Sequence, residues 1–523
     1  MTPRTLLPRR RMAALLLAGV FAVTACASEG GVTTEQVDQL ATTSVATTVA
    51  SPGTTMAPAT TTPGSESTTP SVPGGADGIG DPLFPALGNP GIDVTHYDID
   101  LSFDRATEQL SGSVTLTIAP TQARSTFTLD SMGPEVSAIT VNDIPASFVP
   151  DSPELRITPA TPLQPGVIAT VRVEYSVQVG SVTGAGGLDE GWFDTAKGSY
   201  VVNEPSGARS WLPSNDHPSD KATYTFAITV PAGVTAVANG SLVTHTTANG
   251  HERWVWQEDD PMTTYLIGVV TGDYVIVDTT GPHGVPLSSA VLRADRATMQ
   301  PFIDHTAEQI TFFEQWFGPY PFSNYGIAIA EGPIDGAMET QGRSLFGRAD
   351  FLAGPGDPNS ESLLAHELAH QWFGDAVSPA RWSDIWLNES FATYGEWMWT
   401  DHTGVATLQE QADTALAQRP SEAGGATGSP AADELFGYRS YEGGAVVVHA
   451  LRRTVGDDAF FTILRRWVAE NTGVSRTSAD FIALAEQVSG RSLQQFFATW
   501  LYAVDVPRQF PAESDTATTA PAV

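Results

Sequence analysis

The sequence has a single cysteine, Cys26, among its 523 residues. No disulfide can form within the chain, so the fold must be stabilised by a packed core. The composition allows such a core, because 41% of the residues are hydrophobic and 12 are tryptophans. The length suits a globular protein of two or three domains.

Positively charged residues are scarce. The chain has 26 Lys and Arg against 59 Asp and Glu, which gives a formal net charge of −33. Nucleic-acid binding requires clustered Lys and Arg against the phosphate backbone, and the sequence has no such cluster. We therefore expect no nucleic-acid partner and interpret the acidity as that of a solvated surface.

The N-terminus lacks an apolar run of the roughly 20 residues that cross a bilayer. Arginines at positions 4 and 9–11 precede a shorter apolar run, residues 12–25, which is typical of a secretion signal. The run ends in "VTAC", which resembles the bacterial lipoprotein cleavage box. We predict a signal over residues 1–25 and lipidation of Cys26. An ordinary signal with an incidental cysteine is the alternative, and the adjacent arginines leave twin-arginine export open.

Residues 26–83 lack Lys and Arg and are rich in Thr, Ser, Pro and Gly. Such a segment buries too little apolar surface to offset its ordering entropy, so we predict a disordered, lipid-anchored tether. Residues 509–523 have a similar composition and are predicted to be a disordered tail. Together these features predict a bacterial cell membrane lipoprotein with its globular part on the extracytoplasmic side.

Apolar residues alternate with polar ones through much of residues 84–279. Tyr97, Ile99, Leu101 and Phe103 begin this pattern, and it recurs near residues 114–118, 171–177 and 224–230. A period of two, broken by Pro, Gly, Asn and Asp, predicts half-buried antiparallel strands. We therefore predict an N-terminal β-rich domain over residues 84–279.

Helical spacing replaces this alternation near residue 295. We predict a helix in "ATMQPFIDHTAEQITFFEQWFG", stopped by Gly318-Pro319, and a short strand in "YGIAIAEG". Further helices are predicted over residues 361–376, 384–400, 441–453 and 479–500. The expected fold class is multidomain α+β, with a mainly helical second domain over residues 280–508.

One of these helices carries "LLAHELAHQWFGD", a His-Glu-x-x-His motif. Residues four apart share a helix face, so His366 and His370 can present two imidazoles to one metal ion, with Glu367 beside it. Glu389, which is 19 residues beyond His370, is the candidate third ligand. An amphipathic helix with incidental histidines is the alternative, but the apolar flanks predict burial, where polar groups need partners. Glu396 and Asp384 are candidates for orienting the histidines.

The chain resembles the zinc aminopeptidase family of aminopeptidase N and leukotriene-A hydrolase, which are gluzincin metallopeptidases. The resemblance covers residues 84–508 and depends on four stretches. Besides the zinc motif with its distant glutamate, these are "NEPSGARSWLPSNDHPSDKATY", "GPIDGAMETQ" and "SYEGGAVVVHAL". It implies that a thermolysin-like catalytic domain follows the β-rich domain.

The resemblance also implies a role for each matching residue. His366, His370 and Glu389 are expected to bind one Zn²⁺ per chain, with Glu367 as general base and Tyr441 as hydrogen-bond donor to the oxyanion. Glu339 and Glu204 are expected to bind the free α-amino group of a peptide, and the backbone of Gly336 and Ala337 to pair with that peptide. The implied protein is a secreted, membrane-anchored aminopeptidase that acts on peptides with free N-termini, and we expect a monomer.

The chain departs from the family pattern in two places. Thr340 replaces an asparagine, which removes an amide expected to help fix the motif loop and so affects amine recognition. The chain also ends soon after "FATWLYAVDVPRQF", so we expect a short form without the family's C-terminal helical domain and with a more open active site. An endopeptidase on the same scaffold and a catalytically silent peptide-binding lipoprotein are the alternative functions.

Overall fold

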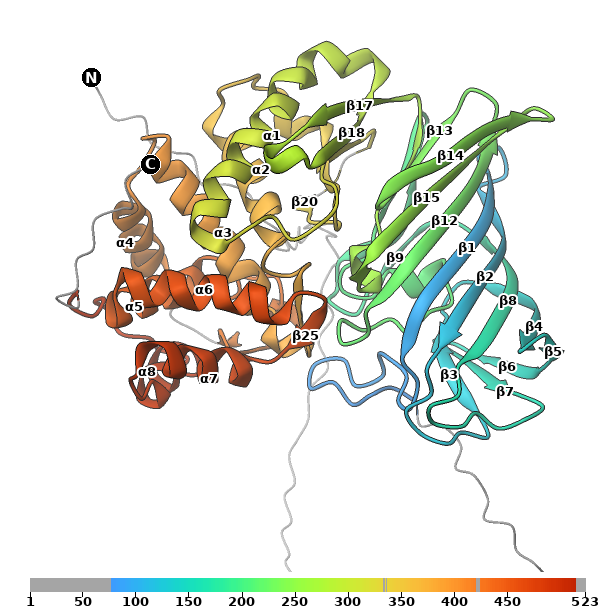
Figure 1. The fold of residues 1–523 in the computed structure, drawn as a ribbon, viewed down its shortest axis with the longest axis horizontal. Helices are drawn as coiled ribbons and strands as arrows, with labels where there is room; N and C mark the ends of the chain where they lie inside the picture. Colours follow the sequence, from blue (N-terminus) through green and yellow to red (C-terminus); the bar gives the residue numbers. More distant parts are fainter. Residues whose placement is uncertain (1–76, 333, 335, 420–423, 514–523) are drawn as a thin grey trace, which may run out of the picture. The chain divides into compact units, whose positions relative to one another are not determined.

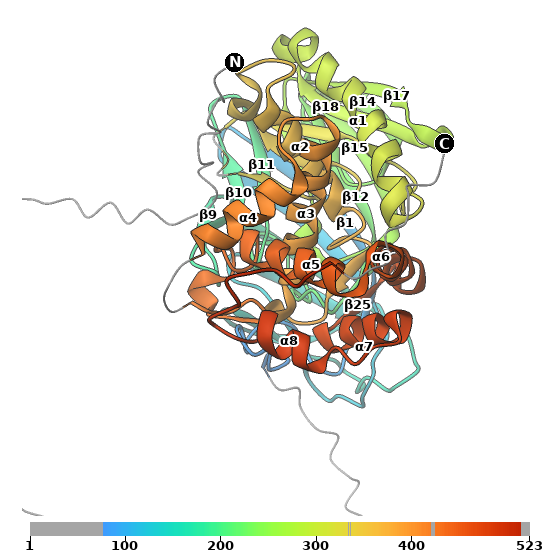
Figure 2. The same ribbon diagram turned by 90° about the vertical axis from the view of Figure 1, so that its left-hand side faces the viewer.

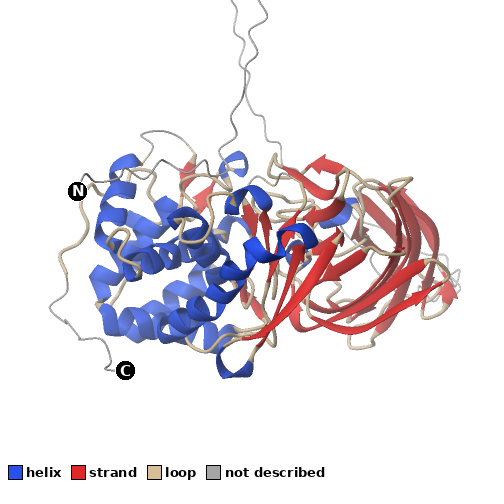
Figure 3. Cartoon of the chain, turned by 90° about the horizontal axis from the view of Figure 1, so that it is seen from above, coloured by secondary structure: helices blue, strands red, loops and turns tan. Residues whose placement is uncertain are grey.

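The computed structural model describes residues 77–332, 334, 336–419 and 424–513 (Figure 1). The predicted signal, the predicted lipidation site Cys26, most of the predicted tether and the last ten residues of the predicted tail lie outside these ranges. All the described residues belong to one compact unit. Its N-terminal part is rich in strands and its C-terminal part consists mainly of helices, as the sequence predicts (Figure 3).

An eight-stranded sheet dominates the N-terminal part, in the order β14-β15-β12-β1-β2-β8-β4-β5. All its neighbouring strands are antiparallel except β1 and β12, which run parallel. Alternate side chains of β1 are buried, as the period of two predicts. The strands are β1 (Val94–Asp104), β2 (Gln109–Ile118), β4 (Glu135–Val141), β5 (Ile144–Pro145), β8 (Ala169–Gln178), β12 (Ala222–Pro231), β14 (Ser241–Ala248) and β15 (His251–Met262).

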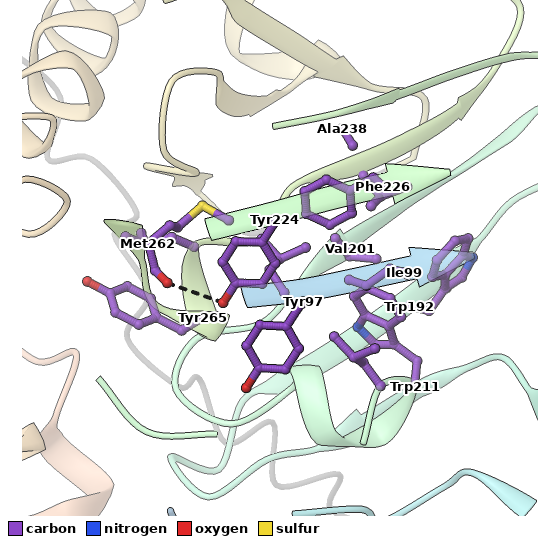
Figure 4. Packing of buried hydrophobic residues seen from close by; sticks show 14 of the residues in the cluster. Tyr97, Ile99, Trp192, Val201, Trp211, Tyr224, Phe226, Ala238, Met262 and Tyr265 are labelled. Carbon is purple, nitrogen blue, oxygen red and sulfur yellow. Dashed lines mark hydrogen bonds between the residues drawn. The ribbon is translucent and has the colours of Figure 1, made fainter. Parts of the chain in front are cut away.

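The buried face of this sheet packs on aromatic residues (Figure 4). Tyr97 lies opposite Tyr224 in the parallel pair, and their rings stack with centroids 4.9 Å apart. Trp192 and Trp211 meet edge to face at 5.5 Å, and both are fully buried. Two smaller sheets complete this part: β3 (Phe127–Asp130), β7 (Glu154–Thr158) and β6 (Ser147–Asp151); and β13 (Thr235–Ala238), β16 (Val269–Gly272), β11 (Gly198–Val202), β10 (Asp189–Asp194) and β9 (Ser181–Thr183).

A fourth sheet, with five strands, begins the catalytic part, in the order β17-β18-β19-β21-β20. The predicted domain boundary at residues 279–280 falls at the end of β17, inside the β17–β18 hairpin, and β18 pairs with β19. Strand β20 lies at the edge and pairs only with β21 among the described strands. The strands are β17 (Tyr274–Thr280), β18 (Pro286–Leu292), β19 (Ile327–Ala330), β20 (Ala337–Met338) and β21 (Ser344–Gly347).

Eight α-helices among the described residues form most of the catalytic part, and α7 and α8 lie below α5 and α6 in Figure 2. Two predicted helices are shorter than expected. The helix predicted over residues 361–376 ends at His370, and the helix predicted over residues 479–500 is two helices, because Gly490 adopts a left-handed φ of 65° and ends α7. The helices are α1 (Arg296–Phe317), α2 (Pro358–His370), α3 (Trp386–His402), α4 (Leu408–Gln418), α5 (Glu442–Val455), α6 (Asp457–Asn471), α7 (Ser478–Ser489) and α8 (Gln494–Trp500).

Short elements complete the fold. They are β22 (Val377–Pro379), which pairs with β25 (Val474–Arg476), and β23 (Gly425–Ala426), which pairs with β24 (Ser429–Pro430). The 3₁₀ helices are η1 (Ala208–Ser210), η2 (Thr264–Leu266), η3 (Pro282–Gly284), η4 (Arg293–Asp295), η5 (Arg348–Phe351), η6 (Trp382–Asp384) and η7 (Ala432–Glu434). None of the helices described is long and apolar enough to span a membrane.

Polar contacts join the strand-rich and helical parts. The carboxylate of Asp81 accepts hydrogen bonds from the backbone N–H of Trp382 at 3.0 Å and from the imidazole of His217 at 3.2 Å. The ammonium of Lys221, the residue before β12, donates to the carbonyl of Asp375, and the Tyr265 hydroxyl donates to the carbonyl of Gly374. These contacts fix the turn that follows α2 against the β-rich domain.

Candidate active site

Helices α2 and α3 bring three potential metal ligands together. Asp357 caps α2 by accepting a hydrogen bond from the backbone N–H of Ser360, and the helix places His366 and His370 one turn apart on the same face. Glu389 lies in the first turn of α3, where the helix dipole favours a carboxylate. The three side chains meet in the interior and are all buried.

The geometry of the three ligand atoms suits zinc. The two histidine Nε2 atoms lie 3.2 Å apart, and Glu389 Oε2 lies 3.4 Å from each of them. In a tetrahedral zinc site with ligand distances of about 2.0–2.1 Å, neighbouring ligand atoms are roughly 3.3 Å apart. Two imidazoles and one carboxylate are also a donor set that zinc prefers in catalytic sites, where a fourth position stays open.

Polar contacts on the far side of each imidazole orient its Nε2 toward the site. The Nδ1–H of His370 donates to the carbonyl of Phe373 at 3.1 Å, and His366 Nδ1 lies 3.3 Å from Glu396 Oε2. Glu396 is therefore the orienting carboxylate. Asp384, the other candidate, lies elsewhere and contacts Arg381 and Ser478.

The charges in the site are strongly coupled. Although burial opposes ionisation, the two imidazoles lower the pKa of Glu389 to about 2. Burial would lower the pKa of His370, but Glu339 and Glu389 raise it well above its usual range. Burial raises the pKa of Glu367 to about 7, with Glu339 and Glu389 adding to the effect and the histidines opposing it. The site therefore concentrates carboxylates around the position for a cation.

Glu204 and Glu339, which we call the glutamate pair, lie beside this position. Glu204 follows β11 and Glu339 follows β20, and their carboxylate oxygens lie within 4.8 Å of each other and of Glu389. Burial raises the pKa of both, and repulsion from neighbouring carboxylates adds to the increase. The Oε1 atom of each is buried and accepts no hydrogen bond from the described residues. Two enclosed acceptors in a negative environment favour a cationic donor.

Thr340 stabilises the loop after Glu339 in a way that the sequence prediction did not include. Its side-chain hydroxyl donates to the backbone carbonyl of Arg343, and the backbone N–H of Arg343 donates to the Thr340 carbonyl at 3.0 Å. The residue is buried. The loop is thus closed by a threonine hydroxyl where the family pattern has an amide.

Gln371 also supports this loop and was missed in the sequence analysis. Its amide nitrogen donates to the carbonyl of Glu339 at 3.1 Å, and its amide oxygen accepts from the backbone N–H of Gly342 at 2.9 Å. This side chain therefore connects the end of α2 with the residue that follows β20. Its position directly after His370 was the only signal in the sequence.

A cavity of about 350 Å³ contains the metal position and the glutamate pair. Glu367 lines it, as do the backbone segment of Gly336 and Ala337 and the ring of Tyr441, which packs nearly parallel to the ring of His366 with centroids 5.9 Å apart. Burial raises the pKa of Tyr441 well above its usual range, and the surrounding glutamates add to this effect. Its hydroxyl group therefore stays protonated and can donate a hydrogen bond.

The fold and this site define a zinc metallopeptidase. The family model described as "Peptidase M1 N-terminal domain" matches residues 94–266, and the "Peptidase family M1 domain" matches residues 302–500. The chain belongs to peptidase family M1, and the triad His366, His370 and Glu389 is the zinc site typical of that family.

Solved structures and curated proteins show the same relationship. A two-domain M1 zinc metallopeptidase mutant bound to L-arginine is 32% identical, with a TM-score of 0.76 over 84% of this chain and 100% of that chain. An M1 zinc metallopeptidase from Deinococcus radiodurans is 33% identical, with a TM-score of 0.75 over 84% of this chain and 100% of that chain.

Among curated proteins, Aminopeptidase M1 of Arabidopsis thaliana is 29% identical over 57% of this chain and 36% of its own length. Aminopeptidase 2 of Candida albicans is 24% identical over 79% of this chain and 47% of its own length. The chain thus spans about a third to a half of the length of these two relatives.

Proposed function

We propose that the protein is a zinc-dependent aminopeptidase that removes the N-terminal residue from peptides. The observation that carries this proposal is the glutamate pair directly beside the metal ligands, in one cavity. The carbonyl carbon of the first peptide bond belongs to the same residue as the α-ammonium group, so an ammonium group bound there brings that carbon next to the metal position. An M1 zinc metallopeptidase mutant from Deinococcus radiodurans, 33% identical to this chain, has been crystallised with a Tyr-Ser-Ala substrate, which supports peptides as the substrate class.

The residues of the cavity have separate tasks in hydrolysis. His366, His370 and Glu389 would hold zinc, which when bound would supply Lewis acidity to a carbonyl oxygen and to water. Glu367 accepts the proton of the attacking water and passes it to the leaving amine. The hydroxyl of Tyr441 donates a hydrogen bond to the carbonyl oxygen as negative charge develops on it.

Strand β20 orients the substrate. It lies at the edge of its sheet, so the backbone of Gly336 and Ala337 can pair with an extended peptide as an additional strand. The peptide amine then meets Glu339 and Glu204, and each carboxylate gains a charge-assisted hydrogen bond from the ammonium group. The glutamate pair therefore limits cleavage to the first peptide bond.

The test compares leucine p-nitroanilide with its N-acetylated form, with and without a chelator. We expect the free amine to be cleaved in a zinc-dependent reaction that is lost in Glu367→Gln, and the acetylated substrate to be cleaved far more slowly. Equal rates on both substrates would instead support the endopeptidase alternative. Peptide binding without zinc-dependent turnover would support the silent binding protein.

We also propose that this enzyme is exported and attached to the cell membrane through lipidated Cys26, with the catalytic domain on the extracytoplasmic side. The signal-like residues 1–25 and the "VTAC" sequence support this proposal. We expect the expressed protein to enter the membrane fraction as a monomer, and the Cys26→Ser variant to be recovered outside it. Recovery of both proteins in the same fraction would refute the anchor.

A further inference from the structure

Apolar residues flank the glutamate pair in the sequence and line the same cavity. Val202 ends β11, two residues before Glu204, and Met338 directly precedes Glu339. Both apolar side chains are buried and line the cavity. The side chain of an N-terminal residue branches from the carbon atom that carries the ammonium group, so it lies close to the glutamate pair. Val202 and Met338 are therefore placed to contact that side chain.

Leu188 and Phe436 continue this apolar lining, and they come from different domains. Leu188 lies in the loop between β9 and β10 of the β-rich domain, and Phe436 follows η7 in the catalytic domain. Gly186 of the same loop lies close to both Phe436 and Pro205, because a Cβ atom at that glycine would be 3.4 Å from Phe436 Cε2 and 3.4 Å from Pro205 Cδ. The loop and the Phe436 ring therefore meet beside the residue that follows Glu204.

Hydrogen bonds hold the β9–β10 loop against the segment that follows β11. The backbone N–H of Gly184 donates to the carbonyl of Leu188 at 2.8 Å, and the N–H of Ala185 donates to Ser206 Oγ at 3.1 Å. The Ser206 hydroxyl and backbone N–H donate to the two carboxylate oxygens of Glu190 at 2.6 and 3.1 Å. Glu190 is buried and does not line the cavity. Leu188 is thus held at the cavity, and the acidic group beneath its loop binds Ser206.

The four residues of this lining, which we call the apolar wall, are Leu188, Val202, Met338 and Phe436. We propose that the apolar wall binds the side chain of the N-terminal residue and selects a large apolar one, such as leucine, methionine or phenylalanine. This inference rests on the proposed aminopeptidase function and names its substrate class. Each methylene group that leaves water for such a wall favours the substrate by about fourfold. An acidic or basic side chain would instead lose its hydration there, because the glutamate pair binds the α-ammonium group.

The test measures kcat/KM for the p-nitroanilides of leucine, phenylalanine, alanine, lysine and glutamate. For the wild type we expect the value for leucine to exceed those for alanine, lysine and glutamate by roughly 10-fold or more. Leu188→Glu places a carboxylate on the wall at a half-buried position, so the lysine derivative should gain about 10-fold relative to leucine. Val202→Ala shortens the wall, so the larger phenylalanine derivative should gain about threefold relative to leucine.

Leu242→Glu is the matched control, because it makes the same substitution at an exposed residue of β14 outside the cavity lining, and it should keep the wild-type ratios. Each ratio is taken within one preparation, so an unfolded fraction cancels from it. If the wild type cleaves the alanine, lysine or glutamate derivative as fast as the leucine derivative, or if both wall variants keep the wild-type ratios, the apolar wall is overturned and the aminopeptidase function stands. Failure to cleave any of the five derivatives would refute the proposed function, and the selective wall with it.

Discussion

Replacing Glu339 with glutamine tests how the enzyme selects a free N-terminus. The Oε1 atoms of Glu339 and Glu204 are enclosed and accept no hydrogen bond from the described residues, so each can accept one from the substrate ammonium. A hydrogen bond to a charged group contributes about 1.5–3 kcal/mol, which corresponds to roughly 10-fold to 150-fold in rate or affinity. Glutamine keeps the shape of Glu339 but removes its negative charge.

We therefore expect Glu339→Gln to lower kcat/KM for leucine p-nitroanilide by about 10-fold to 100-fold. The slow cleavage of the N-acetylated substrate should change little, because that substrate carries no ammonium. Glu204→Gln should act in the same direction. The double variant should lose less than the product of the two single effects, because both carboxylates act on one group.

The assay measures kcat/KM for both substrates in each variant. Glu331→Gln is a matched control, since Glu331 lies outside the cavity lining and forms an ion pair with Lys197. The reasoning would be refuted if Glu339→Gln stayed within threefold of the wild type on the free amine. It would also be refuted if the variant lost equal activity on the free and acetylated substrates.

Three further changes test other parts of the site and fold. Tyr441→Phe keeps the ring against His366 but removes the hydrogen-bond donor, so kcat should fall by roughly 100-fold to 1,000-fold with little change in KM; a loss confined to KM would contradict the assigned role. Glu396→Gln should weaken zinc binding by about 10-fold to 100-fold in a competition titration with a chelator, because Glu396 orients His366; unchanged affinity would remove that role. Asp81→Asn should lower the free energy of unfolding at pH 7 by about 2 kcal/mol. Burial would raise the pKa of Asp81, but hydrogen bonds from His217 and from three backbone N–H groups outweigh burial and lower that pKa to about 2. Since that pKa is depressed, the stabilisation is present above about pH 4 and is lost as the pH falls toward 2, so denaturant unfolding curves of the two proteins should converge on acidification.

The metal site could be predicted from the sequence because its geometry is local. His366 and His370 are four residues apart in one helix, and a helical repeat alone puts them on one face. A turn and a second helix are needed to bring Glu389 to the two histidines, and the breaks in the helical pattern between α2 and α3 indicated both. The sequence also left two candidates for the orienting carboxylate, and only the packing of α3 on α2 distinguishes Glu396 from Asp384.

The glutamate pair could not be predicted from periodicity or spacing. Glu204 and Glu339 follow strands of different sheets, and they meet only because the β-rich domain packs against the catalytic domain. Their roles were accessible only through the resemblance to a family. Gln371 carried no signal beyond its position directly after His370, because its contacts arise from tertiary packing.

Element boundaries show the same distinction between local and distant effects. Gly490 ends α7 through its left-handed conformation. A single glycine within a helical pattern is compatible with a continuous helix, so the prediction continued the helix through Gly490. The alternating residues of β17 resemble those of the strands before it, so the pattern placed β17 with them. Its hairpin partner β18 instead pairs with β19, which lies more than thirty residues further along the chain. The alternation of residues within a strand does not indicate which distant strand pairs with it in parallel.

The most direct test of the central claim is the zinc content of the purified protein, measured by mass spectrometry together with peptidase activity. The account predicts one zinc ion per chain in the wild type. It also predicts that zinc and activity are lost together in His370→Ala and Glu389→Ala, and that Glu367→Gln keeps the metal but loses activity. A wild type without stoichiometric zinc, or ligand variants that keep both zinc and activity, would contradict it.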